Sequence, residues 1–191
     1  DQPATVAHAV WVEPADIEIL AAKGVTVAHN PVSNLKLASG VAPVPALLRA
    51  GVNVTLGTDG VASNNNLNLW EEMKLMGLLH KWGSQNPTVI TPQEVLAAAT
   101  INGARAQGRG NTGEIAVGKR ADLLLLNIDQ PHYQPCYDIL NNLVYAAQGG
   151  DVTLTMVDGR ILYRDGEFTS LDYEKVVFEV EKQRQAILAQ L

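Results

Sequence analysis

The stretch Val52-Asn53-Val54-Thr55-Leu56-Gly57-Thr58-Asp59 decides the fold, because a short β-prone run ends there in a carboxylate. Similar runs at 5–8 and 25–29 precede it, and each also ends in a polar side chain. Helical segments at 14–24 and 43–51 separate the three runs, with proline near each start and glycine at each end. Strands that alternate with helices in this way indicate parallel βα units of an α/β protein.

Two further helices are predicted downstream of the third run. Residues 67–82 carry apolar side chains at helical spacing. Thr91 is a good N-cap residue, and Pro92 and Glu94 occupy the positions that favour a first helical turn. That helix is expected to continue towards Ala106.

The pattern changes after residue 108. Residues 109–171 are rich in turns and include a predicted strand at 121–126 and a hairpin over 152–164 with Asp158-Gly159 at its turn. Residues 172–191 form a predicted amphipathic helix. We therefore expect three parts, comprising residues 1–108, 109–171 and 172–191.

Three polar residues stand at equivalent places in the consecutive units: His8, His29 and Asp59. The carboxyl ends of parallel strands meet at one edge of a sheet, where α/β proteins build their chemistry. Any one of these residues alone is explained by capping a strand or bonding to a loop. Three in consecutive units favour a site that binds a metal or moves protons.

The remaining candidate residues favour structural interpretations. His80 lies near the end of a predicted helix, where a cation suits the helix dipole, and His132 lies in a proline-flanked loop. Cys136 is a lone thiol that we expect to be buried or inert. The run 64–66 is a typical solvated turn, but its place after Asp59 favours a position beside the site.

Composition excludes several classes of protein. The net charge of −6 and a pI near 5.1 argue against a nucleic-acid partner. No apolar run reaches the roughly 18 residues that a membrane span needs. A single cysteine and the lack of a signal peptide at the start favour a cytoplasmic location. Asp1 stands where a start methionine is expected, so we expect further chain before it.

Five stretches together resemble the amidohydrolase superfamily, in the branch of cytosine, guanine and adenosine-thioether deaminases and triazine hydrolases. They are residues 6–10, 28–40, 56–65, 99–104 and 113–123. The last two motifs are shared across the superfamily. Asn30 to Leu37 together with Thr58 to Asn65 resemble more narrowly the 5-methylthioadenosine/S-adenosylhomocysteine deaminases.

The resemblance implies a (β/α)₈ TIM barrel and a small composite β-sandwich, of which this chain holds the last three barrel strands and a share of the sandwich. It also implies one divalent metal ion, with zinc favoured over iron, manganese or nickel. Asp59 matches the aspartate that ligates the metal and takes a proton from water. His8 matches the histidine that contacts that water and the substrate, and His29 takes a substrate-facing place.

The family also needs a His-x-His pair, a further histidine and a catalytic glutamate from earlier strands, and none is in this chain. We therefore expect this chain alone to be inactive and to pair its open strand edges with the missing N-terminal half or with a second copy. The implied substrate is an adenine thioether nucleoside. Two alternatives stay open: another purine, pyrimidine or triazine ring as substrate, and a non-catalytic structural half-barrel.

Overall fold

The computed structural model describes residues 4–190, which divide into two compact units. The first unit contains the chain up to residue 119 together with residues 128–149. The second contains residues 120–127 and the chain from residue 150 onwards. The expected division at residues 108 and 171 stays a prediction, and the two units are described separately below.

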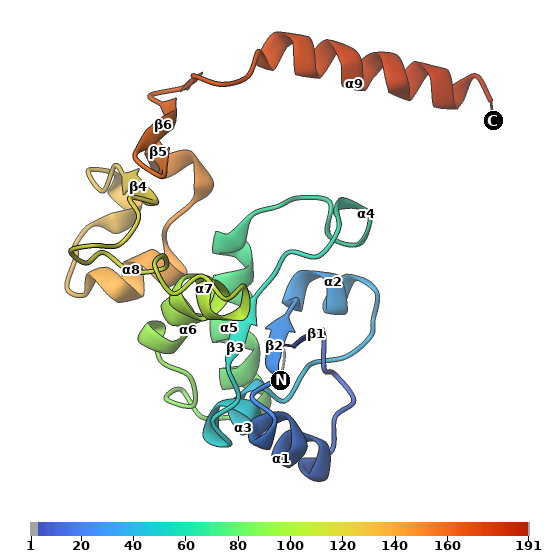
Figure 1. Ribbon diagram of the computed structural model, residues 1–191, viewed down its shortest axis with the longest axis vertical. Coiled ribbons are helices and arrows are strands. Elements are labelled where there is room, and N and C mark those ends of the chain that lie inside the picture. Colours follow the sequence, from blue (N-terminus) through green and yellow to red (C-terminus); the bar gives the residue numbers. More distant parts are fainter. Residues whose placement is uncertain (1–3, 191) are drawn as a thin grey trace. The chain divides into compact units, whose positions relative to one another are not determined.

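A parallel three-stranded sheet lies in the first unit (Figure 1). Its strands are β1 (Thr5–Ala7), β2 (Thr26–His29) and β3 (Val54–Leu56), in the order β1-β2-β3. Ala7 pairs with Ala28, and His29 pairs with Leu56. The predicted parallel βα units are therefore confirmed, although the strands are shorter than the β-prone runs.

Helices of the first unit pack against β3 and against one another. α5 and α6 both contact β3, and α1 contacts α3. The helices are α1 (Pro14–Ala22), α2 (Pro31–Lys36), α3 (Val44–Arg49), α4 (Val61–Asn64), α5 (Leu69–Ser84), α6 (Pro92–Ala99), α7 (Ile101–Ala106), the 3₁₀ turn η1 (Pro131–Tyr133) and α8 (Ile139–Tyr145).

The core of the first unit fills the space between the sheet and its helices. Val27 and Val54 from the strands, Leu47 from α3 and Met76 from α5 are completely buried. Burying one such side chain contributes about 1.5–3 kcal/mol relative to exposure. His29 lies two residues after Val27 on the same strand, and side chains at that spacing share one face, so His29 also faces the helices.

The single helix predicted from residue 91 to residue 106 is wrong, because the structure divides it at Thr100. The predicted cap is confirmed: the Thr91 hydroxyl accepts from the Glu94 backbone N–H at 3.3 Å. At Thr100 the backbone leaves the helical region, with φ −128° and ψ −95°. The break lets both pieces bond to β3: Ala98 O accepts from the Thr55 hydroxyl, and Asn102 Nδ2 donates to Val54 O.

The second unit is a four-stranded antiparallel sheet followed by a helix. β4 (Leu123–Leu126), β5 (Val152–Val157), β6 (Arg160–Arg164) and β7 (Glu167–Phe168) pair in that order, and the 3₁₀ turn η2 (Gly149–Asp151) precedes β5. Asp158 and Gly159 both have positive φ, as a two-residue hairpin turn requires, so the predicted hairpin is confirmed.

The helix α9 (Tyr173–Leu188) ends the described chain. The Asp172 side chain caps it by accepting from Lys175 N at 3.0 Å. This confirms a helix within the predicted range 172–191, of which residue 191 lies outside the described residues. None of the helices in residues 4–190 combines the length and the apolarity that crossing a membrane requires.

Two glycines of the first unit have the same backbone conformation but different surroundings. Gly113 and Gly118 have nearly equal positive φ values of 88° and 85°. A Cβ on Gly113 would lie 2.8 Å from both Ala104 Cβ and Ile101 Cα, whereas a Cβ on Gly118 would meet nothing within 4 Å. A side chain would therefore be crowded at position 113 and would have free space at position 118.

We predict that Gly118→Ala lowers the free energy of unfolding by about 1–2 kcal/mol, the cost of a left-handed alanine. Gly113→Ala should cost about 1–3 kcal/mol more, because α7 must shift. Urea denaturation monitored by circular dichroism measures both. Equal losses in the two variants would show that the contact with α7 is unimportant.

Candidate active site

The three predicted residues follow their strands at the carboxyl edge of the sheet. His8 comes directly after β1, and its backbone N–H donates to Ala28 O at 2.9 Å, which extends the pairing by one residue. His29 is the last residue of β2, and Asp59 comes three residues after β3. Asp59 and His8 are close enough for the charge of His8 to act on the carboxylate.

Asp59 receives two hydroxyl hydrogen bonds on one oxygen. Ser33 Oγ donates to its Oδ2 at 2.7 Å and Ser63 Oγ donates to the same atom at 2.8 Å. The bonds from Ser33 and Ser63, then that of the Gly60 backbone and the charge of His8, hold the pKa of Asp59 below its usual range. The carboxylate is therefore ionised at neutral pH, and it is exposed to solvent.

Both His8 and Asp59 have left-handed backbones, with φ 68° and 59°. Such conformations are uncommon for residues other than glycine and persist where the surroundings over-determine them. For His8 the surrounding contact is Asn34, whose Oδ1 lies 2.9 Å from His8 Nδ1. This contact engages Nδ1 and fixes the ring, so the other ring nitrogen, Nε2, is the one left to interact with other groups.

The helix α2 connects the two strand-end residues. Ser33 bonds to Asp59, and the next residue, Asn34, bonds to His8. Both are almost completely buried, at 1% and 2% exposure. The helix itself was not predicted, because six residues after a proline show too little periodicity to separate it from a loop.

His29 lies in a different environment from the other two. It is completely buried, and its Nε2 lies 3.4 Å from Nε2 of His80 on α5. Burial, with the charge of His80 as the smaller cause, lowers the pKa of His29 to about 3; burial lowers that of His80 to about 4. The interpretation of His80 as a cation at a helix end is therefore wrong, because a neutral ring fills a packed interior position.

Two other expectations concern residues outside this cluster. Cys136 is exposed, which excludes burial, the first of the two alternatives expected for it, and leaves the expectation of an inert thiol as a prediction. His132 is also exposed, with its ring 4.5 Å from that of Tyr133, in accord with a structural interpretation. Neither residue is among the contacts of Asp59 or His8 described above.

Glu72 was missed by the sequence reasoning. It lies on α5 with no exposed surface, and burial raises its pKa. Its carboxylate accepts from Val32 N at 3.1 Å and from Asn64 Nδ2 at 2.6 Å. The period of the apolar residues in the predicted helix places Glu72 beside Met73 and Met76 on the buried side, and this is the signal that could have found it.

The residues that the structure describes can supply one ligand of a metal site but not the complete set of ligands. No group of three or more histidine, cysteine, aspartate or glutamate side chains in residues 4–190 is arranged to hold a metal ion. Zinc takes four ligands, with carboxylate oxygen among those it accepts. The ionised carboxylate of Asp59 suits one such ligand, and the others must come from elsewhere.

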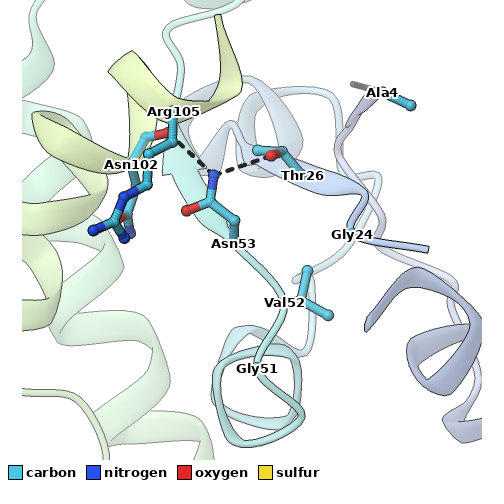
Figure 2. A pocket seen from close by; sticks show the side chains of 8 residues that line it. All are labelled: Ala4, Gly24, Thr26, Gly51, Val52, Asn53, Asn102 and Arg105. Carbon is cyan, nitrogen blue, oxygen red and sulfur yellow. Dashed lines mark hydrogen bonds between the residues drawn. The ribbon is translucent and has the colours of Figure 1, made fainter. Parts of the chain in front are cut away.

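A hollow at the opposite, amino end of the strands has a different character (Figure 2). Thr26, Asn53, Asn102 and Arg105 lie along it. Asn53 Nδ2 donates to Thr26 Oγ1 at 3.0 Å and to Asn102 O at 3.1 Å. The two bonds of Asn53 connect β2, the start of β3 and α7. They therefore stabilise the amino end of the sheet.

Comparison with known proteins identifies the class of the chain. Residues 2–162 match the model of the amidohydrolase family. A crystal structure of an adenosine deaminase from Xanthomonas campestris with bound zinc superimposes with a TM-score of 0.94 at 38% identity, over 97% of this chain and 42% of that one. A zinc complex of an atrazine chlorohydrolase from Arthrobacter aurescens gives 0.88 at 29% identity, over 93% and 40%.

The chain therefore belongs to the amidohydrolase family. Its fold is the last part of a (β/α)₈ TIM barrel with a share of a small β-sandwich, as expected. It is 50% identical over 185 residues to a 5′-deoxyadenosine deaminase of Methanosarcina mazei, covering 97% of this chain and 43% of that protein. It is 49% identical over 180 residues to a 5-methylthioadenosine/S-adenosylhomocysteine deaminase of Dictyoglomus thermophilum, covering 94% and 42%.

The histidine pair generates a prediction about stability and pH. The folded pKa values of His29 and His80 lie below the ordinary value of 6.5, so the unfolded chain binds more protons in acid. Stability from this pair is complete above about pH 6.5 and is lost as the pH falls towards 4 and 3. Lowering the pH from 7.5 to 5.5 should cost on the order of 1 kcal/mol for each histidine.

His80→Gln should remove roughly half of this loss, and the exposed His132→Gln is the matched control. Urea denaturation at pH 7.5 and 5.5 gives the change for each protein. If His80→Gln and the wild type lose the same stability between the two pH values, the histidine pair is not the cause.

Proposed function

We propose that the complete protein is a metal-dependent hydrolase that deaminates adenine-type nucleosides. The observation that carries the proposal is the arrangement of two strand-end residues, an ionised Asp59 and His8, which are both hydrogen-bonded by side chains of α2. The deaminase relatives at about 50% identity support the reaction type. Because the chain spans less than half the length of these relatives, the activity belongs to a larger protein than the 191 residues.

The residues of this chain supply one proton acceptor and one hydrogen-bonding group. Water adds to the ring carbon that bears the amino group, and ammonia leaves after taking up protons. Asp59, kept ionised by its two serine bonds, accepts a proton from the attacking water. The His8 ring, fixed by Asn34 through Nδ1, leaves Nε2 to contact the water as an acceptor or the developing alkoxide as a donor, according to its tautomer. The glutamate that protonates the ring nitrogen belongs to the missing strands.

A divalent metal, zinc first and iron, manganese or nickel as alternatives, completes the proposal. Two solved relatives contain zinc. When bound, the metal supplies Lewis-acid chemistry by lowering the pKa of a water to about 7. Asp59 is the ligand that we assign to this chain. The burial of His29 favours an indirect role through the packing of β2, so its contact with substrate stays a prediction.

The relatives indicate which nucleosides to test. The names 5-methylthioadenosine, S-adenosylhomocysteine and 5′-deoxyadenosine all describe an adenine ring on a ribose whose 5′ position lacks a hydroxyl. We propose this class as substrate, with adenine thioether nucleosides first. A triazine ring is the alternative favoured by the chlorohydrolase neighbour at 29% identity. An assay of ammonia and chloride release on both classes distinguishes them.

The open sheet edge supports the proposal that the remaining barrel strands are a required partner. All three residues of β1 are exposed, including the apolar Val6 at 38%. A parallel edge strand with exposed apolar side chains is a template for another strand. We propose the N-terminal half as the partner, with a second copy as the alternative.

We predict different effects for the two site residues in the complete protein. Asp59→Ala should lower kcat by about 10⁴-fold or more and reduce bound metal, because it removes both a ligand and the proton acceptor. His8→Ala should lower kcat by about 10²–10⁴-fold with metal content unchanged. Metal analysis beside steady-state kinetics measures both. Loss of metal in the His8 variant alone would reverse the assigned roles.

We also predict that the 191-residue chain alone has no deaminase activity with added zinc and that mixing it with the N-terminal half restores turnover. The missing ligands and the open edge of β1 are the physical reasons. Ammonia release from 5-methylthioadenosine and light scattering measure activity and association. An active monomer of 20.5 kDa would contradict the prediction.

A further inference from the structure

Glu72 is a buried carboxylate that the mechanism above does not use. It has no exposed surface and lies on α5 beside the apolar Met73 and Met76. A carboxylate is costly to bury unless its oxygens are hydrogen-bonded, and an apolar side chain at this position would avoid that cost. The function of Glu72 must therefore lie in the bonds that it makes.

Each of those bonds reaches the sequence neighbour of a residue that contacts Asp59. Oε2 accepts from Val32 N, and the next residue along α2 is Ser33. Oε1 accepts from Asn64 Nδ2, and the residue before Asn64 on α4 is Ser63. One carboxylate thus connects the two helices whose serines converge on Asp59.

A third bond brings the backbone of Asp59 into the same network. Asn64 Nδ2 also donates to the carbonyl of Thr58 at 2.7 Å, one residue before Asp59. Asp59 itself is exposed and has a left-handed backbone with φ 59°. Such a residue keeps its geometry only where neighbouring groups hold it. The bond from Asn64 to the Thr58 carbonyl holds the backbone immediately before Asp59, and Asn64 is itself held by Glu72.

We infer that Glu72 is a positioning residue for Asp59: it sets the spacing of α2 and α4 so that both serine hydroxyls meet the same carboxylate oxygen. This inference rests on the proposed function, in which Asp59 is the metal ligand and proton acceptor. Groups that orient a ligand from behind typically change activity or metal affinity by 10- to 100-fold when altered.

Glu72→Gln tests the inference with little change in volume. Its amide places a donor against Val32 N–H or against the Asn64 amide. If Asn64 rotates to accept from the new amide, it withdraws its own donor from Thr58. Glu71→Gln is the matched control, because Glu71 is exposed and accepts from Asn66 Nδ2 at 2.8 Å, outside the network.

In the complete protein, Glu72→Gln should lower kcat about 10- to 100-fold with KM within about two-fold. Hydrogen exchange should accelerate in residues 31–36 and 58–65 and stay unchanged in β2 and α6. Glu71→Gln should match the wild type in kinetics and exchange. A Glu72→Gln protein that melts at lower temperature but keeps wild-type kcat would show a structural role only and overturn the inference.

Asn64→Ala is the second variant, and it decides the question if Glu72→Gln does not fold. It removes the bonds to Glu72 and Thr58 and leaves the carboxylate bonded to Val32 N. We expect kcat to fall about ten-fold. A value within two-fold of wild type overturns the inference.

Failure of the proposed function has a separate signature. If the wild-type protein does not deaminate any adenine nucleoside, the proposed function is wrong, and hydrogen exchange of 31–36 and 58–65 in the two variants still decides the positioning role. Unchanged exchange in both variants would reject the role of Glu72 whatever the reaction.

Discussion

The pairing of β2 with a parallel strand on each side is the constraint on which the rest of the first unit depends. Thr26 N donates to Ala4 O and Val27 N donates to Asn53 O, each at 2.9 Å, so one strand orients both neighbours. His8 N and Gly57 N continue the pairing beyond the strands, with acceptors Ala28 O and His29 O. The carboxyl ends of all three strands therefore lie at the same edge of the sheet. Polar residues that follow the strands are close together there without long connecting loops.

The loops at that edge are organised from the outside by helices. α2 bonds to His8 through Asn34 and to Asp59 through Ser33, and α5 bonds to α2 and α4 through Glu72. The functional groups at the surface thus rest on polar contacts that are partly buried, and the bond between Asn64 and Glu72 behind them is fully buried. This arrangement accounts for an exposed carboxylate with a defined orientation.

The sequence allowed the parallel units, the strand-end residues and the hairpin to be predicted, because each follows from local signals: β-prone runs, glycine and proline positions, and an Asp-Gly turn. The roles of Ser33, Asn34 and Glu72 could not be predicted from the sequence. Their significance comes from contacts across 26 to 40 residues, which no local pattern records. His80 was misread for a similar reason, since its environment depends on β2.

Some differences arise because tertiary contacts override local preference. Thr100 follows a run of good helix formers, Leu96 to Ala99, and the chain breaks there so that α6 and α7 can both bond to β3. Cys136 was expected to be buried or inert, and it lies in an exposed loop although free cysteines are usually buried. In each case the sequence preference is real and weaker than the packing of the unit.

The two bonds made by Ser33 and Asn34 each close a segment of 26 residues. The entropic cost of closing such a segment grows only slowly with its length, so bonds across 26 residues cost little more than bonds across half that distance. The whole network from His8 to Glu72 is contained in one continuous stretch of chain ahead of the second unit. During synthesis on the ribosome, every residue of this network therefore emerges before the antiparallel sheet has been translated.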